Sequence, residues 1–387
     1  MSVRIITGDC RAVLATLPDE SVHCVVTSPP YWGLRSYLAD GDPLKPLELG
    51  LEPTLGEHLT VLVDEFRAVR RVLRKDGTVW LNYGDCYATS PNGRSAAATK
   101  AAGNDDRTFR DKPFSTIGPI CAPKPGDENR AAGGTLKPKD LCMVSNRLAI
   151  ALQDDGWWVR SEIVWHKPNP MPESIKDRPG SAHEKVWLLT RSERYWYDAE
   201  AVRQPMAASS GPRLAQDIDN QPGSTRANGG RKTNGAMKAV GGARRSDKQR
   251  GHSRRHQGFN ERWDAMPREE QMAGGCNLRN VWTIATAAFS EAHFATFPPA
   301  LIEPCIKAGC PEGGTVLDPF GGSGTTGLVA DRLGRNAILI ELNPKDVGMA
   351  CRRIKGDAPL FVDVARGTEG TQSSFLPNTA AVTEQPQ

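Results

Sequence analysis

The residues whose types and spacing best suit chemistry form the stretch Ser28-Pro29-Pro30-Tyr31, which follows an apolar run at 22–26. Two successive prolines remove two backbone donors and fix two φ angles, so this stretch can neither continue a sheet nor enter a helix interior. Unpaired carbonyls, the hydroxyl of Ser28 and the ring of Tyr31 remain. Oxygens can accept the protons of an amino group while the ring stacks, so the stretch predicts a site for a planar, amino-bearing ring.

A second chemical motif lies near the C-terminus, where Asp318 ends an apolar run and Phe320 leads into the turn Gly321-Gly322-Ser323-Gly324. Glycines allow a ligand to approach the backbone closely. The exposed N–H groups of a helix that begins at Thr325 favour an anionic group. The turn therefore predicts an anion-binding site, with the carboxylate of Asp318 beside it for a positive group.

The residues after the turn narrow the choice of ligand. Glu341 ends the next predicted strand and Asn343 follows it, and a carboxylate in that place typically accepts ribose hydroxyls. Residues 322–327 also fit the dinucleotide pattern G-x-G-x-x-G, a weak signal by itself, but NAD would bring a pyrophosphate close to Asp318. S-adenosylmethionine fits better, because its ammonium can meet Asp318, its ribose Glu341 and its carboxylate the glycine turn. We expect S-adenosylmethionine, with NAD as the alternative.

Apolar runs and helical spacing alternate along the rest of the chain, which is the pattern of an α/β fold with a mostly parallel sheet. A helix is expected at 58–73, and Gly77 after it is expected to be its stop. Strands are expected at 3–6, 22–26, 78–82, 159–165, 315–317 and 337–341, a hairpin at 185–190 with 195–198, and helices at 11–17, 58–73, 141–152 and 325–333.

Composition sets wider limits. The chain has 387 residues, 39% of them hydrophobic and 24% charged, as in an ordinary globular protein. No run approaches the roughly 18 apolar residues of a membrane span, and no signal-peptide pattern is present, so we expect a cytoplasmic protein. The nine cysteines form no C-x-x-C pair or Cys/His cluster, which predicts reduced thiols and no metal site.

Positive charge is concentrated in one segment. Residues 203–256 hold twelve Lys or Arg against three Asp, which indicates either a solvated loop or a contact for phosphates. The expected organisation is a catalytic half at 1–88, a flexible insert at 89–139, the continuation of the catalytic half at 140–202, the basic insert at 203–276, a donor-binding half at 277–360 and a disordered tail at 361–387.

Together these residues resemble the beta group of DNA amino-methyltransferases, which modify N4 of cytosine or N6 of adenine. Ser28-Pro29-Pro30-Tyr31 resembles the catalytic motif, and the stretch from Asp318 to Thr326 the donor-binding motif. The segment from His293 to Pro298, with Phe297, resembles the one that covers the methionine end of the donor. Gly8-Asp9-Cys10 resembles the site where an acidic residue, here Asp9, contacts the adenine of the donor.

The resemblance implies a methyltransferase fold of the Rossmann-like kind, with a seven-stranded sheet and a circularly permuted chain, because the catalytic motif precedes the donor motif. It implies direct methyl transfer to a base that is flipped out of duplex DNA and stacked on Tyr31, with Trp32 assisting. Ser28 and the carbonyl of Pro29 would accept the amino protons. The basic insert falls where this group has its target-recognition region.

The partner implied is double-stranded DNA, with a cognate restriction endonuclease as a further, separate partner. Lys167 lies in a loop that resembles one near the active site of the family, and the densest positive charge of the insert supplies the other expected DNA contacts. These are Arg244, Arg245, Arg254 and Arg255.

Several alternatives remain open. Ser28 after Thr27 resembles the N4-cytosine subgroup, whereas N6-adenine enzymes usually carry Asp or Asn there. Pro304-Cys305 would suit a cytosine-C5 enzyme, but the cysteine is expected to be structural. A binding protein without catalysis and an RNA target are further alternatives. We expect Trp157, Trp158 and Trp165 to pack in the core or a hairpin, and 82–85 to turn the chain.

Overall fold

The computed structural model describes residues 2–33, 36–88, 136, 139–206, 274–286, 297–357 and 363–368. Its contacts divide the chain into two units, residues 1–198 with 279–387, and residues 199–278. In the second unit, Gln204 and Cys276 pair through both of their backbone N–H groups, each at 2.8 Å. The elements below belong to the first unit.

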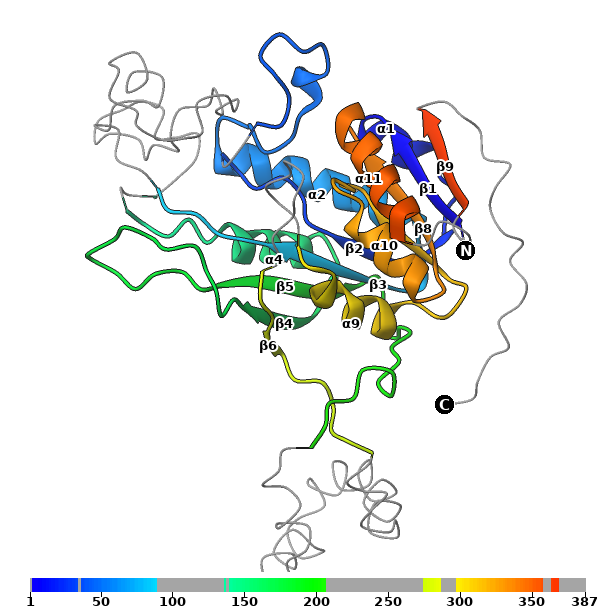
Figure 1. The fold of residues 1–387 in the computed structure, drawn as a ribbon. Coiled ribbons are helices and arrows are strands. Elements are labelled where there is room, and N and C mark those ends of the chain that lie inside the picture. The colour runs from blue at the N-terminus through cyan, green and yellow to red at the C-terminus, as the bar shows by residue number, and fades with distance from the viewer. Residues whose placement is uncertain are drawn as a thin grey trace, which may run out of the picture. The chain divides into compact units, whose positions relative to one another are not determined.

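A nine-stranded sheet forms the centre of the first unit (Figure 1). Its strands pair in parallel except β5, which is antiparallel to β3 and β4. From one edge to the other they are β6 (Val281–Thr283), β4 (Trp158–His166), β5 (His183–Thr190), β3 (Leu73–Tyr83), β2 (Val22–Thr27), β7 (Thr315–Asp318), β8 (Asn336–Glu341), β1 (Ser2–Thr7) and β9 (Asp363–Thr368).

The sheet has two more strands than the expected seven. β6 and β9 lie at its two edges. β6 is only three residues long and β9 is mostly polar, so neither has the apolar run on which strand prediction depends. β9 also corrects the expectation that the whole tail from 361 is disordered, because residues 363–368 pair along β1.

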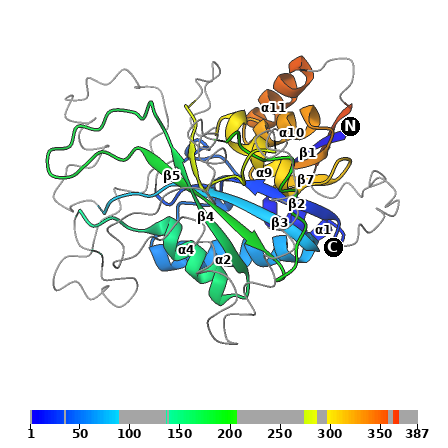
Figure 2. The ribbon, with the colours of Figure 1, turned by 90° about the horizontal axis from the view of Figure 1, so that it is seen from below.

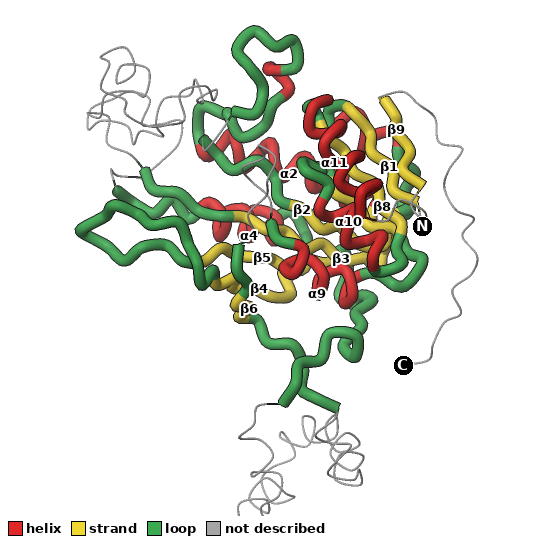
Figure 3. The backbone as a smooth tube through the Cα atoms, in the orientation of Figure 1, coloured by secondary structure: helices red, strands yellow, loops and turns green. Residues whose placement is uncertain are grey.

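Helices cover both faces of the sheet, α1, α2 and α4 on one and α9, α10 and α11 on the other (Figures 2 and 3). This two-sided cover is what a parallel sheet requires, because both of its faces are apolar. The helices are α1 (Cys10–Thr16), α2 (Leu55–Val72), α4 (Val144–Asp154), α9 (Pro299–Gly309), α10 (Thr325–Arg332) and α11 (Pro344–Asp357), with a 3-10 turn, η1 (Lys45–Leu47), before α2.

The ends of α2 follow from its sequence, with one correction. Thr54 and Glu57 form a capping box that satisfies donors at its start. The helix ends at Val72, and Leu73 already begins β3, so the expected stop at Gly77 is wrong. Gly77 lies within β3, and a Cβ there would come 2.6 Å from Leu73 Cδ1, which accounts for the glycine.

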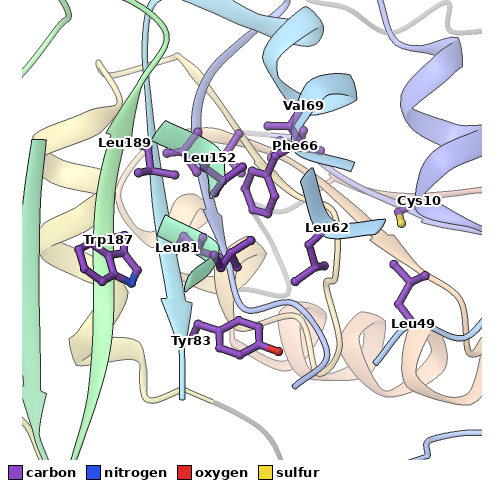
Figure 4. Packing of buried hydrophobic residues seen from close by; sticks show 14 of the residues in the cluster. Cys10, Leu49, Leu62, Phe66, Val69, Leu81, Tyr83, Leu152, Trp187 and Leu189 are labelled. Carbon is purple, nitrogen blue, oxygen red and sulfur yellow. The ribbon is translucent and has the colours of Figure 1, made fainter. Parts of the chain in front are cut away.

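A hydrophobic core cluster lies between the sheet and the face formed by α1, α2 and α4. Phe66 packs there among Leu62, Leu81 and Leu152, and all of these side chains are buried (Figure 4). Leu62 and Phe66 of α2 and Leu152 of α4 belong to the apolar faces that the helical spacing in the sequence predicts.

The expected hairpin at 185–198 does not form. β5 pairs with β3 and β4 instead, and Trp196 N donates to Asp76 O at 2.8 Å. Trp157 and Trp165 are buried as expected, whereas Trp158 is 41% exposed. No helix among the described residues is long and apolar enough to cross a membrane.

Candidate active site

The two chemical motifs meet because their strands are neighbours. β2 and β7 pair in parallel, with Val25 opposite Leu317, so the residues that follow both strands lie at the same edge of the sheet. A cavity of about 740 Å³ opens there. Of the residues predicted from the sequence, those that line it are Asp9, Ser28, Pro29, Pro30, Tyr31, Lys167, Phe297, Asp318, Phe320, Gly321, Gly322, Ser323, Thr325, Glu341 and Asn343.

Asp318 is held in place by its own chain. Its Oδ1 accepts hydrogen bonds from Thr27 Oγ1 at 2.7 Å and from Phe320 N at 3.1 Å, and its Oδ2 accepts one from Thr326 Oγ1 at 2.6 Å. The residue is 1% exposed, and this burial raises the pKa of its carboxyl to about 6. The carboxylate therefore also fixes the geometry between the two motifs.

Glu341 organises the glycine turn from the neighbouring strand β8. Its Oε2 accepts from Gly322 N and its Oε1 from Asn343 N, each at 2.8 Å. Burial raises the pKa of the Glu341 carboxyl to about 7. Each carboxylate oxygen keeps a second lone pair, so both can still accept a hydroxyl from a ligand in the cavity.

Gly324 is a glycine for a different reason from the one expected. It caps the start of α10 with a φ of +77°, a conformation that glycine adopts without strain. A Cβ there would come 2.8 Å from Ala350 Cβ of α11. Close packing of two helices, rather than the approach of a ligand, accounts for this residue, which does not line the cavity.

Arg353 of α11 supports the same turn and was not found from the sequence. Its Nη1 donates to Thr325 Oγ1 at 2.7 Å, to Ser323 Oγ at 2.9 Å and to Ser323 O at 3.2 Å. No helix was expected from the sequence at 344–357, so no sequence signal marked this arginine.

Asp9 lines the cavity as the N-cap of α1. It accepts from Arg11 N at 3.1 Å and pairs with the Arg11 guanidinium at 2.8 Å. Behind it, Glu65 of α2 is 3% exposed and accepts from Cys10 Sγ. Burial raises the pKa of Glu65 to about 7.

Tyr31 is fixed on several sides. Its ring packs against Tyr83, with centroids 4.6 Å apart and planes tilted by 35°, and a Cβ on Gly84 would come 2.7 Å from its Cε2. Its hydroxyl lies 2.9 Å from Glu184 Oε2 and accepts from Ser28 Oγ at 3.4 Å. Burial raises the pKa of Tyr31 well above its usual value, which keeps the phenol protonated.

A buried hydrogen-bond network stands behind this tyrosine. His58 Nε2 lies 2.8 Å from Tyr83 Oη and His58 Nδ1 lies 2.7 Å from Glu52 Oε2. Tyr83 Oη also accepts from Trp32 N at 2.9 Å. The network fixes the backbone that follows the double proline.

Trp32 corrects an expectation. It is 6% exposed, its indole donates to Glu52 O at 2.9 Å, and it belongs to the core cluster rather than to the cavity lining. Its ring is therefore used in packing and is not available to stack on a base.

Lys167 and Glu184 form an ion pair inside the cavity lining. The Lys167 ammonium also lies over the Trp165 ring, 4.5 Å from its centroid. Both charged side chains are 19% exposed. The sequence singled out Lys167 but not Glu184, which sits near the start of β5 without a motif around it.

The segment after β3 was also misjudged. We preferred 82–85 as a turn of the chain over the alternative that it lines the site, and Asn82, Gly84 and Asp85 do line the cavity. The available signal was the position of Asn82 and Asp85 at the end of a strand that pairs in parallel with β2.

Cys305, which a cytosine-C5 enzyme would use as its nucleophile, is structural, as expected. Cys305 lies inside α9, is 1% exposed, and its thiol donates to Leu301 O. Burial raises its pKa well above the usual value, which disfavours a thiolate nucleophile.

Some predicted residues lie outside the described part of the chain. These are Arg244, Arg245, Arg254 and Arg255, and residues 293–296 of the segment before Pro298. Within the described ranges, no group of three or more His, Cys, Asp or Glu could hold a metal ion.

A mostly parallel sheet with the Ser28-Pro29-Pro30-Tyr31 stretch and a glycine turn at one edge is the arrangement expected of an amino-methyltransferase. The chain belongs to the N6/N4 methyltransferase family, whose model, described as DNA methylase, matches residues 22–351. It is a DNA methyltransferase, and S-adenosylmethionine is the methyl donor that the family uses.

Similar proteins agree with this assignment. The chain is 39% identical to the type II methyltransferase M.XycI of Xanthomonas campestris pv. cyanopsidis, over 92% of this chain and 89% of that protein. It is 37% identical to M.Cfr9I of Citrobacter freundii, with the same coverage. The solved PvuII DNA methyltransferase (cytosine-N4-specific) shares the fold, with a TM-score of 0.51 at 18% identity over 94% of this chain and 96% of that one.

Proposed function

We propose that this protein transfers a methyl group from S-adenosylmethionine to the exocyclic N4 of cytosine in duplex DNA. One observation carries the proposal: the Ser28-Pro29-Pro30-Tyr31 stretch and the glycine turn line the same cavity. An amino-bearing ring and a donor with a ribose and an anionic group can therefore meet there.

The donor half of the cavity fits S-adenosylmethionine chemically. Glu341 offers two oxygens with free lone pairs to ribose hydroxyls. The N–H groups of all three glycines in the turn bond within the protein, so those of the first turn of α10 are proposed to meet the carboxylate. Asp9 is proposed for the adenine, Phe297 for the methionine end and Asp318 for the ammonium. When bound, the donor supplies an electrophilic methyl group on a sulfonium.

The catalytic half makes the amino nitrogen more nucleophilic. The nitrogen of a base amine is weakly nucleophilic because its lone pair is delocalised into the ring. Ser28 Oγ and the carbonyl of Pro29 are proposed to accept the amino protons, which shifts the nitrogen toward sp³ and directs its lone pair at the methyl group. Tyr31, held from behind by Tyr83, stacks the base. Catalysis is then mainly positioning and electrostatics.

A base inside a duplex cannot reach this cavity, so the target nucleotide must be flipped out. Lys167 is proposed for a DNA contact, and Arg244, Arg245, Arg254 and Arg255 for contacts to phosphates or bases. The type II names of the relatives support a place beside a separately acting restriction endonuclease, in the bacterial or phage-infected cytoplasm where the DNA lies.

Cytosine N4 is preferred over adenine N6 because a hydroxyl, Ser28, takes the first position of the motif. N6-adenine transfer is the second candidate, since a hydroxyl can accept an adenine amino proton as well. Labelled donor and two duplexes of equal length test this choice, one unmodified and one in which every adenine is replaced by purine, which lacks the 6-amino group. Equal labelling of both supports N4-cytosine, and loss of label from the purine duplex contradicts it.

A further inference from the structure

Three oxygen atoms form a chain that leads out of the catalytic motif. Ser28 Oγ lies 3.4 Å from Tyr31 Oη, and Tyr31 Oη lies 2.9 Å from Glu184 Oε2. The first two residues follow β2, whereas Glu184 belongs to β5 on the other side of β3. All three line the cavity.

The reaction proposed above creates a proton that this chain of atoms could remove. The amine that gains a methyl group becomes cationic and must lose a proton. Ser28 carries a neutral hydroxyl, which can pass a proton on but is too weak a base to keep one. Tyr31 remains protonated because of its burial and of the charge of Glu184, so it too can only relay.

We propose that Glu184 is the terminal proton acceptor of methyl transfer, reached through Ser28 and Tyr31. This inference rests on the proposed function. As the N–CH₃ bond forms and the S–CH₃ bond breaks, the amine gives its proton to Ser28 Oγ. The hydroxyl proton of Ser28 passes to Tyr31 Oη, and that of Tyr31 passes to Glu184. Ser28 and Tyr31 end unchanged, Glu184 ends as a carboxylic acid, and the donor leaves as a neutral thioether.

The surroundings of Glu184 suit this role. Lys167 pairs with its Oε1, and Asn82 Nδ2 donates to its Oε2 at 3.2 Å, so the carboxylate is oriented toward Tyr31. The side chain is 19% exposed, which leaves a way for the proton to reach solvent after the reaction.

A nearby carboxylate has a different task. Asp85 also lines the cavity, but its Oδ1 accepts from Cys86 N at 2.9 Å and from Val144 N at 3.1 Å. These bonds tie the end of β3 to the start of α4. Asp85 therefore holds the backbone, whereas Glu184 faces the tyrosine hydroxyl.

The test measures single-turnover methyl transfer by wild type, E184Q, E184D and Y31F, with donor affinity and thermal midpoint measured in parallel. Loss of a proton acceptor typically slows a reaction by about 10²–10⁴-fold. E184Q and Y31F should slow transfer by about that factor and E184D by less, with donor affinity unchanged. E162Q is the matched control, because Glu162 pairs with Lys185 outside the cavity lining, and it should react as wild type does.

A second variant distinguishes proton removal from a merely structural role. S28D places a carboxylate next to the amine, where it can take the proton directly, so E184Q should slow S28D little. Base flipping, read as 2-aminopurine fluorescence at the target position, should be the same in E184Q and wild type. An E184Q rate equal to wild type, or the same loss in the S28D background, would overturn the proposal. If E184Q fails to fold, the rate of Y31F, alone and in the S28D background, tests the proposal instead.

The wild-type reaction distinguishes a failure of the proposed function from a failure of the role proposed for Glu184. If wild type transfers no methyl group to a base amine, the proposed function is wrong. If wild type does so and E184Q is equally fast, only the role of Glu184 is wrong.

Discussion

Thr27 Oγ1 donates a hydrogen bond to Asp318 Oδ1 at 2.7 Å, and both residues are almost wholly buried. Thr27 is the last residue of β2 and Asp318 the last of β7. The bond therefore joins the strand that carries the amino-ring motif to the strand that carries the donor turn. The relative position of the two proposed substrates depends on this contact.

Replacing Thr27 by valine should weaken this junction. The change keeps the shape of the side chain but leaves Asp318 Oδ1 without one of its donors, at a cost of about 1–3 kcal/mol in the free energy of unfolding. Urea unfolding and calorimetry with S-adenosylmethionine measure stability and donor affinity, and both should fall. T60V is the control, since Thr60 is exposed and bonds only within α2. Equal stability of T27V and T60V would contradict this account.

Donor affinity should rise with pH between about 6 and 8. The pKa of Glu341 is raised to about 7 by burial, so the free protein binds a proton there below neutral pH. Ribose hydroxyls bind the ionised carboxylate, hence the donor competes with that proton. One pH unit below the pKa, affinity should be about tenfold lower.

Titration calorimetry at several pH values, with E341Q as the comparison, measures this effect. E341Q should bind the donor more weakly and lose the part of the pH dependence that belongs to the carboxyl. Parallel profiles for E341Q and wild type would show that Glu341 does not contact the donor.

Tyr83→Phe should reduce both stability and methyl transfer. It deletes the hydroxyl that accepts from Trp32 N and lies 2.8 Å from His58 Nε2, which leaves buried polar groups unpaired at a cost of about 1–3 kcal/mol. The backbone at 30–32 should loosen, so the rate of transfer should fall while donor affinity stays the same. Urea unfolding and single-turnover kinetics measure the two effects, and a normal rate in Y83F would mean that the network does not position Tyr31.

Neutralising Arg244, Arg245, Arg254 and Arg255 to glutamine should weaken DNA binding and flatten its dependence on salt. Each lost phosphate contact reduces the slope of log K against log salt by about 0.9. Filter binding at several salt concentrations measures the slope, and R160Q, which removes an arginine at the Tyr195 ring, is the control. An unchanged slope would indicate that the basic insert does not contact phosphates.

The sequence predicted the central strands and the helices α1, α2, α4 and α10 because each carries an apolar run, as at 22–26, or an apolar period, as along α2, whereas α11 was not predicted. The edge strands β6 and β9 lack that period and form by pairing with neighbours that are remote in the sequence. The end of α2 was predicted to within one residue, at 73 against Val72, but Gly77 is not its stop, because that glycine lies in β3 and packs on Leu73.

The candidate site divides in the same way. Residues within contiguous motifs, such as Tyr31 and Gly322, could be found from residue types and order. Glu184 and Arg353 could not, because each acts through a contact made only by folding, on the Tyr31 hydroxyl and on the Ser323–Thr325 turn. Trp32 was misassigned because an aromatic residue next to a motif gives no sign of which way it faces.

The most direct test of the central claim is nucleoside mass spectrometry of duplex DNA treated with the wild-type protein and S-adenosylmethionine, beside S28A. The account predicts N4-methylcytosine with wild type, and strongly reduced product with S28A at unchanged donor affinity. N6-methyladenine as the product would contradict the choice of base, and full activity of S28A would contradict the role of Ser28.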